Sequence, residues 1–274
     1  MSEPELARLT AESLAEIRRR TPLIHNITNF VVMNDTANVL LAVGASPVMA
    51  HALEEVREMV GYAGALVLNI GTLEEAWIEA MLAAGEEANL RRVPIVLDPV
   101  GVGATRLRTA TAERIRSAVR VAVIRGNAAE LATIAGLEAR IRGVDSVAAG
   151  DPEAAARLAA ERFGGVGVVS GAVDHVADAT RSAEVHNGHA LMSRITGSGC
   201  MATAMVGAFL AVEPDPFLAA TEAMIAFGIA GEIAAERSAG PGTFRSQLID
   251  AVAALDEASI LARARSTMRQ SQPA

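Results

Sequence analysis

Lysine is missing altogether from this 274-residue chain, because every one of its 24 basic residues is an arginine. The absence excludes mechanisms that need a lysine side chain, such as a Walker A phosphate loop, a pyridoxal Schiff base or a lysine aldolase. Cysteine occurs only once, so the chain cannot form an internal disulfide. A single thiol fits a reducing compartment, and we expect a cytoplasmic location.

Positive charge is scarce relative to negative charge. The 24 arginines are outnumbered by 32 aspartates and glutamates, which gives a formal net charge of −8, and no basic run stands out. A general nucleic-acid binder needs a basic surface to pair with phosphates, so we expect no nucleic-acid partner.

Long hydrophobic runs are also missing. The longest apolar stretch, Cys200 to Val212, is too short to span a bilayer, and residues 1–20 lack the apolar core of a signal peptide. We therefore expect no membrane partner. Half of the residues (51%) are hydrophobic and can fill a core, and no linker or repeat divides the chain, which predicts a single domain over residues 1–274.

Short β-branched runs alternate with longer alanine-rich runs along the first part of the chain. The alternation predicts a mainly parallel sheet with helices on both faces, since the apolar runs show no polar alternation. The predicted strands are Ser46–Met49, Ala65–Ile70, Ile95–Leu97, Val121–Ile124 and Val166–Val169. The predicted helices are Glu5–Arg19, Asn29–Ala42, Leu73–Ala88, Thr109–Ala118, Ala128–Ala135 and Pro152–Arg162.

The pattern changes after Val169. Three short strands separated by Asp, Asn and Gly turns predict a β-meander at one sheet edge: His175–Ala177, Ala183–Val185 and Leu191–Ile195. The rest is predicted to be helical, over Cys200–Val212, Phe217–Arg237 and Phe244–Ala264. The polar tail, Ser266–Ala274, is expected to fray.

Small and polar residues follow the predicted strands one after another. They are Asn69 with Gly71, Asp98 with Gly101 and Gly103, Arg125 to Asn127 with Glu130, and Ser170 with Gly171. Parallel sheets bind ligands beyond the carboxyl ends of their strands, so this placement favours a small-molecule site. A purely structural sheet could close the same turns with any capping residues.

The segment from Gly197 through Ser198 and Gly199 to Cys200 directly precedes a long apolar helix. Glycines let several backbone N–H groups face one point, and the helix N-terminus adds partial positive charge, so an anion hole is predicted. The same field is expected to lower the pKa of Cys200 and favour its thiolate. A plain glycine-rich helix start with a buried cysteine is the structural alternative.

Oxygen donors near the strand ends suit Mg²⁺. Asp98, Asn127 and Glu130 supply them, and Mg²⁺ prefers such ligands together with water and phosphate. Arg125 can hold a phosphate bidentately. With the anion hole, these features indicate phosphoryl transfer. As structural alternatives, Glu130 could stabilise a helix dipole and Asp98 could initiate a turn before Pro99.

Six segments, in order along nearly the whole chain, resemble the hydroxyethylthiazole kinase family. They read HNITNFVVMNDTANVLLAVGASPVMAH from His25, LVLNIGT from Leu66, LDPVGVGATRLR from Leu97, IRGNAAEL from Ile124, VVSG from Val168 and TGSGCMATA from Thr196. The first segment and the cysteine of the last are specific to that family. The Asn127-to-Glu130 spacing and the glycine motif are shared with the wider ribokinase-like superfamily.

The resemblance implies a ribokinase-like α/β fold and transfer of the ATP γ-phosphoryl group to the primary alcohol of 4-methyl-5-(2-hydroxyethyl)thiazole, in thiamine biosynthesis. It implies a homotrimer with the thiazole site near the subunit interface. By position, Met49 and Gly197 contact the thiazole, and Asn29, in a polar stretch before a helix, suits a further contact. The remaining roles fall to Arg125, Ser170 and Asn127 for ATP, to Asp98 and Glu130 for Mg²⁺, and to Cys200 beside the attacking hydroxyl.

Most ribokinase-like enzymes carry an aspartate base where this chain has Cys200. A loose phosphoryl-transfer transition state needs little base assistance, so we expect Cys200 to be a weak or assisting base and the backbone of Gly197–Cys200 to carry most of the rate. A hydroxymethylpyrimidine kinase is the alternative, and an ATP-dependent dehydratase is another, but both should keep the aspartate. A non-catalytic nucleotide-binding module should lack the acidic residues or the glycines.

Overall fold

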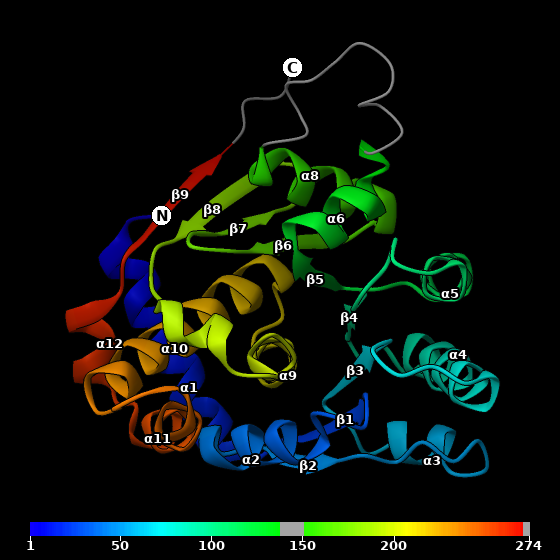
Figure 1. Cartoon of the computed structure of the whole chain (residues 1–274), viewed down its shortest axis with the longest axis horizontal. Coiled ribbons are helices and arrows are strands. Elements are labelled where there is room, and N and C mark those ends of the chain that lie inside the picture. Colours follow the sequence, from blue (N-terminus) through cyan, green and yellow to red (C-terminus); the bar gives the residue numbers. More distant parts are fainter. Residues whose placement is uncertain (138–150, 271–274) are drawn as a thin grey trace.

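The computed structural model describes residues 1–137 and 151–270, and one nine-stranded sheet runs through this part (Figure 1). The strand order is β2-β1-β3-β4-β5-β6-β7-β8-β9, parallel from β2 to β6 and antiparallel from there on. The strands are β1 (Leu23–Ile27), β2 (Ser46–Val48), β3 (Ala65–Asn69), β4 (Ile95–Asp98), β5 (Val123–Asn127), β6 (Val166–Ser170), β7 (Asp174–Ala177), β8 (Arg181–Val185) and β9 (Ser266–Gln270).

Helices cover both faces of the sheet, as the alternation of the sequence predicts. One face packs against α1 (Glu3–Arg20), α2 (Met33–Val43), α9 (Ser198–Leu210), α10 (Pro216–Glu236), α11 (Pro241–Ala254) and α12 (Glu257–Arg263). The other packs against α3 (Val56–Val60), α4 (Glu75–Arg91), α5 (Arg106–Ala118), α6 (Ala128–Ala135) and α8 (Pro152–Phe163). Neighbouring strand residues alternate between the two cores: Val67 joins the first, whereas Leu66 and Leu68 join the second.

The predicted edge meander is correct for two of its strands and wrong for the third. β7 and β8 pair antiparallel, but Leu191–Ile195 is not a strand, because a 3₁₀ helix, η2 (Ala190–Arg194), occupies this segment. The His189 ring starts that turn by accepting a hydrogen bond from the backbone of Leu191 at 3.2 Å. The third strand is β9, from the tail expected to fray, and its polar side chains suit a sheet edge. The last four residues of that tail, 271–274, lie outside the described residues.

The structure differs from the sequence prediction at two further places. The helix predicted over Phe244–Ala264 is broken into α11 and α12, because the Asp256 carboxylate caps the second helix at the backbone N–H of Ser259 (2.8 Å). The sequence pattern does not predict strand β1, because His25 and Asn26 interrupt its apolar run. Both are buried polar residues, and His25 bonds the backbone oxygen of Ala50 at 2.7 Å.

The helix predicted over Phe217–Arg237 is present as α10, and it is longer than the apolar stretch Cys200–Val212. Its length and composition would allow it to cross a membrane, but 83% of its apolar window is buried inside the protein, where it packs against α9 and α11. Its surroundings are those of a core helix.

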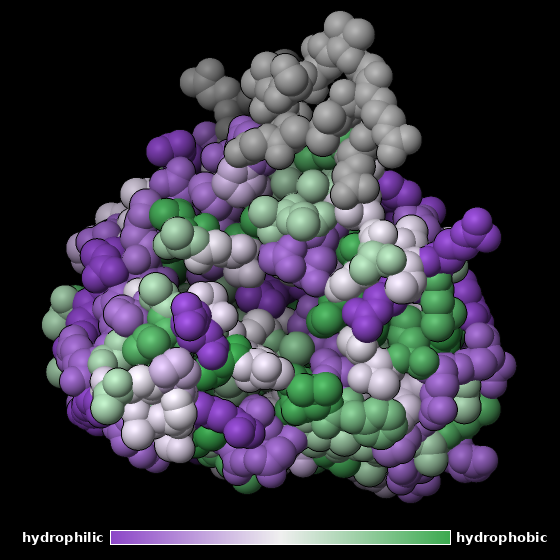
Figure 2. Space-filling view, viewed as in Figure 1, coloured by the Kyte–Doolittle hydropathy of each residue, from purple (hydrophilic) through white to green (hydrophobic). Residues whose placement is uncertain are grey.

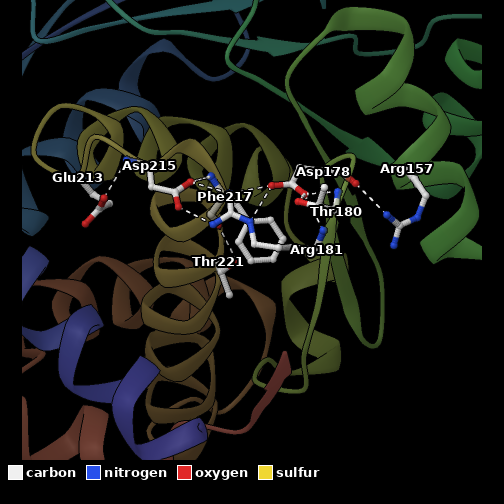
Figure 3. Close-up of polar contacts among 8 residues, drawn as sticks. All are labelled: Arg157, Asp178, Thr180, Arg181, Glu213, Asp215, Phe217 and Thr221. Atoms are coloured by element: carbon white, nitrogen blue, oxygen red, sulfur yellow. Dashed lines mark hydrogen bonds and ion pairs between the residues drawn. The ribbon is translucent and has the colours of Figure 1, made fainter. Parts of the chain in front are cut away.

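Arg181 connects the antiparallel half of the sheet to α10 (Figure 3). Its guanidinium lies over the Phe217 ring, 4.4 Å from the centroid, and donates to Asp178 at 2.8 Å and to Asp215 at 3.0 Å. Asp215 is also the N-cap of α10, accepting from the backbone of Phe217 at 3.0 Å. The hydrogen bond to Asp215 raises the pKa of Arg181, so the side chain is a permanent cation. Its contacts with Asp178 and Asp215 fix the β7–β8 turn to the start of α10.

Replacing Arg181 by Ala should lower the free energy of unfolding by about 2 kcal/mol, because two partly buried carboxylates lose their partner and the Phe217 ring loses its cation. Urea denaturation at neutral pH measures this change. Arg8→Ala is the matched control, since it removes only an exposed pair with Glu12 and should cost less than about 0.5 kcal/mol. Equal losses for the two variants would contradict the role given to Arg181.

Candidate functional site

The strand order changes direction between β1 and β3, and the candidate site lies at the carboxyl ends of these strands. From β1 the chain crosses through α2 to the edge strand β2, whereas β3 is followed outward by β4, β5 and β6. Parallel sheets form a ligand crevice at such a switch point. Asn29, just past β1, donates to the Asn69 side chain at the end of β3 at 2.9 Å, which joins the two sides of the crevice.

Cys200, in the first turn of α9, lies against these amides. Its sulfur accepts hydrogen bonds from Asn69 at 3.2 Å and from Asn29 at 3.7 Å. The expected thiolate is wrong: burial, followed by the charge of Asp98, raises the pKa of Cys200 to about 12 and outweighs the amide donors and Arg125. The side chain is therefore a neutral thiol at physiological pH.

Asp98 ends β4 at the centre of the site and is only 1% exposed. One of its oxygens, Oδ2, accepts from Asn69 at 2.9 Å and from the Thr203 hydroxyl at 2.8 Å. Burial raises its pKa to about 6, although Arg125 and these donors act in the opposite direction. At neutral pH a buried carboxylate thus lies next to a neutral thiol.

Arg125, Ser170 and Gly199 form an anion-binding corner. The Arg125 side chain, in β5, is 8% exposed and donates to the Ser170 hydroxyl at 2.7 Å. A methyl group on Gly199 would lie 2.8 Å from a guanidinium nitrogen, so this glycine allows the cation to reach the first turn of α9. The Nε of Arg125 is buried without a hydrogen-bond partner. An orphaned buried cationic donor beside a helix N-terminus fits an anionic ligand.

Glu130 links the loops that follow β4 and β5. One oxygen accepts from the backbone N–H of Gly101 at 2.8 Å and the other from that of Asn127 at 2.9 Å, while the Asn127 side chain accepts from the backbone of Glu130 at 2.9 Å. This reciprocal pair is a capping box at the start of α6. The structural alternative for Glu130, a helix-capping acid, is therefore present, and the carboxylate also faces the cavity.

A cavity of about 810 Å³ brings most of the predicted site residues together, and the face seen in Figure 2 is hollowed near its centre. Its apolar lining includes Met192, Met224 and Phe227. Its polar lining contains the predicted residues Asp98, Arg125, Asn127, Glu130, Ser170, Gly197, Ser198, Gly199 and Cys200.

Two predicted substrate contacts lie outside the lining of this cavity. Asn29 is hydrogen-bonded to Cys200, which does line the cavity. Met49 follows the edge strand β2, and its carbonyl oxygen accepts from the ring of His51 at 3.1 Å. Cys200 lines the cavity and is hydrogen-bonded to Asn29, so it connects the cavity to the loop that follows β1.

The carboxylates fit a magnesium ion held partly by other ligands. Asp98 and Glu130 line the same cavity, but among residues 1–137 and 151–270 no group of three or more His, Cys, Asp and Glu side chains is arranged to hold a metal ion. Mg²⁺ keeps several waters and is bound through one or two carboxylates plus substrate phosphates. The donor set suits an ion that arrives with a nucleotide.

Three further residues shape the site, although the sequence alone does not mark them as functional. Thr203 holds Asp98, and its signal is a hydroxyl one helical turn after Gly199 in an otherwise apolar helix. Asp174 holds the turn after β6 by accepting from Gly171 at 3.0 Å, and burial raises its pKa to about 6. Arg108 donates to the backbone oxygens of Val100 (2.7 Å) and Gly71 (2.8 Å), which braces two site loops.

The raised pKa of Cys200 predicts slow alkylation. With a pKa near 12, about one molecule in ten thousand is a thiolate at pH 8, and the iodoacetamide reaction rate should rise about tenfold per pH unit from pH 7 to 9.5. Mass spectrometry follows the reaction without interference, because this is the only cysteine. The control is the same chain unfolded in guanidinium chloride. A rate that levels off near pH 7 in the folded protein would contradict a neutral thiol.

Comparison with known proteins gives consistent matches over nearly the whole chain. A sequence profile described as the hydroxyethylthiazole kinase family matches residues 14–258. The chain is 53% identical over 266 residues to the hydroxyethylthiazole kinase of Desulforudis audaxviator, with 97% of each chain covered. It is 52% identical over 247 residues to that of Methanocella arvoryzae, which covers 90% of this chain and 93% of the relative.

Solved structures agree with these matches. The hydroxyethylthiazole kinase protein from Pyrococcus horikoshii OT3 is similar with a TM-score of 0.88 at 45% identity, covering 95% of this chain and 99% of that one. At 12% identity, a ribokinase-like superfamily protein from Enterococcus faecalis has a TM-score of 0.61, with 84% and 86% covered. The expected ribokinase-like fold is confirmed, and the chain belongs to the hydroxyethylthiazole kinase family.

Proposed function

We propose that this protein transfers the γ-phosphoryl group of ATP to the primary alcohol of 4-methyl-5-(2-hydroxyethyl)thiazole, a step of thiamine biosynthesis, with residues 1–274 acting as one kinase domain. The observation that carries the proposal is Cys200, which lines the same cavity as the orphaned cationic donor of Arg125 and is held by the amides of Asn29 and Asn69. Nucleotide and alcohol would both approach this residue. An aspartate-based pyrimidine kinase has no such cysteine.

The nucleotide half of the site would be the cavity. Arg125, Ser170 and Asn127 would bind the phosphates, and the apolar lining residues Met224 and Phe227 suit the face of an adenine ring. Asp98 and Glu130 would hold Mg²⁺, which supplies charge neutralisation at the phosphates. The N–H groups of Gly197, Ser198 and Gly199 would stabilise the negative charge of the transferred group.

The acceptor half would be formed by Met49, Gly197 and Asn29. The substrate hydroxyl oxygen, placed beside Cys200, attacks the γ-phosphorus while the bond to the ADP oxygen breaks. Because Cys200 is a neutral thiol, its role is to position the hydroxyl. The hydroxyl proton leaves late, to a phosphate oxygen or water, as a loose transition state allows.

A homotrimer in the cytoplasm, with the acceptor site near a subunit interface, completes the proposal. Large apolar side chains are exposed around the β2 edge, and Figure 2 shows hydrophobic surface in the lower half of the molecule, where β1, β2 and α2 lie. These side chains are Phe30, Val31, Leu41 and Leu53. A second copy could cover them. Sedimentation equilibrium at micromolar protein tests this assembly, and a monomer would contradict it.

A coupled ADP-release assay tests the activity. ATP, Mg²⁺ and hydroxyethylthiazole are supplied, with hydroxymethylpyrimidine in a parallel reaction. ADP release that depends on both the thiazole and Mg²⁺ would support the proposal. ADP release with hydroxymethylpyrimidine but not with the thiazole would identify the pyrimidine alcohol as the substrate. A folded protein that is inactive with both alcohols would refute the kinase function.

Replacing Cys200 by Ser should leave measurable turnover, with kcat within about tenfold of the original, because a positioning hydroxyl can replace a thiol that accepts no proton. The ADP assay measures it, and circular dichroism verifies the fold. Complete loss of turnover in a folded variant would mean that Cys200 acts as an obligatory base.

Replacing Gly199 by Ala should lower kcat/KM for ATP about tenfold to a hundredfold, because the new methyl group displaces the Arg125 guanidinium from the anion-binding corner. Gly242→Ala is the matched control, since nothing lies within 4 Å of the added carbon in the first turn of α11. Similar kinetics for the two variants would contradict the close approach of Arg125 to α9.

A further inference from the structure

Trp77 connects the two loops that follow strands β1 and β2. This residue, the only tryptophan of the chain, lies in the first turn of α4 after β3 and is 3% exposed. The His51 ring, from the loop after β2, stacks on it with centroids 4.2 Å apart and planes at 5°. The Phe30 ring, from the loop after β1, meets it edge-on at 4.7 Å and 76°. We call these three residues the aromatic cluster.

The cluster holds the two segments that carry the proposed acceptor contacts. Phe30 directly follows Asn29, whose amide donates to Asn69 and Cys200. His51 is two residues beyond Met49, and its Nδ1–H donates to the Met49 carbonyl oxygen at 3.1 Å. The rigid element behind both loops is α4, whose Trp77 side chain belongs to the apolar core on its face of the sheet.

We propose that the aromatic cluster is the positioning device for the alcohol substrate, with Trp77 fixing the separation between the Asn29 and Met49 ends of the acceptor site. This inference rests on the proposed thiazole kinase activity. Stacked and edge-on aromatic pairs have defined geometries, and a site works only when such supporting contacts hold its loops in place. Because the cluster supports two loops at once, loosening it changes their spacing.

The nucleotide half does not depend on this support. Arg125 and Ser170 come from β5 and β6, and the Arg125 guanidinium is held by the Ser170 hydroxyl. A positioning role for Trp77 therefore predicts a selective defect in the alcohol substrate. A merely structural role predicts lower stability and equal effects on both substrates.

Three substitutions separate these outcomes in the full-length protein. Trp77→Leu should raise KM for hydroxyethylthiazole about threefold to tenfold with KM for ATP within about twofold, because the aromatic pairs are lost while the core position stays apolar. Trp77→Phe, which retains a ring, should have a KM for hydroxyethylthiazole close to that of the original chain. Phe163→Leu is the control: it removes a ring from the same apolar core at the end of α8. It should leave the ratio of the two KM values unchanged.

Fluorescence gives a readout that does not require turnover. All tryptophan emission comes from Trp77, so hydroxyethylthiazole added without ATP should change it saturably. The inference is overturned if the original chain turns over the thiazole while its emission stays unchanged, or if Trp77→Leu raises both KM values equally. An original chain that releases no ADP with the thiazole refutes the proposed function itself, and this inference with it.

Discussion

The side-chain amide of Asn69 is the contact on which the site depends. Its nitrogen donates to Asp98 and Cys200, and its oxygen accepts from the Asn29 amide and the backbone of Gly71, at 2.9 to 3.2 Å. The side chain is 1% exposed, so each lost bond would leave a buried polar group unpaired. One amide therefore fixes the relative positions of the β1 loop, β4 and α9.

Burial raises the pKa of both ionisable neighbours of Asn69, but only one of them, Asp98, is charged at neutral pH. It raises the pKa of Asp98 only to about 6, so this carboxylate is charged at neutral pH, but it raises the pKa of Cys200 to about 12. The negative charge of Asp98 contributes to the raised pKa of Cys200, because a thiolate beside this carboxylate would place two anions next to each other. The site thus holds one carboxylate, which would suit a cation, and one neutral thiol, while Arg125 and the start of α9 provide positive potential.

The sequence predicts the strands and site residues where residue type alone fixes the local structure. It predicts them less well where contacts between distant segments determine the structure or the ionisation state. Buried parallel strands and the polar residues at their ends, such as Asp98 and Arg125, can be predicted from apolar runs. Strand β1 cannot, because His25 and Asn26 interrupt its apolar run and the contact of His25 with Ala50 is not visible in the sequence. The expected thiolate of Cys200 is wrong for the same reason: the helix start is visible in the sequence, whereas desolvation by neighbouring elements is not.

The switch point between β1 and β3 also divides the site into halves with different constraints. The half beyond β4, β5 and β6 consists of a capping box, a glycine-rich helix start and a buried arginine, and the last two suit a phosphate group. The half beyond β1 and β2 consists of loops, and loops alone would leave the alcohol loosely placed. Trp77 contacts both of them from a helix. Selectivity for the alcohol therefore depends on how firmly the aromatic cluster holds these loops, and phosphate recognition does not.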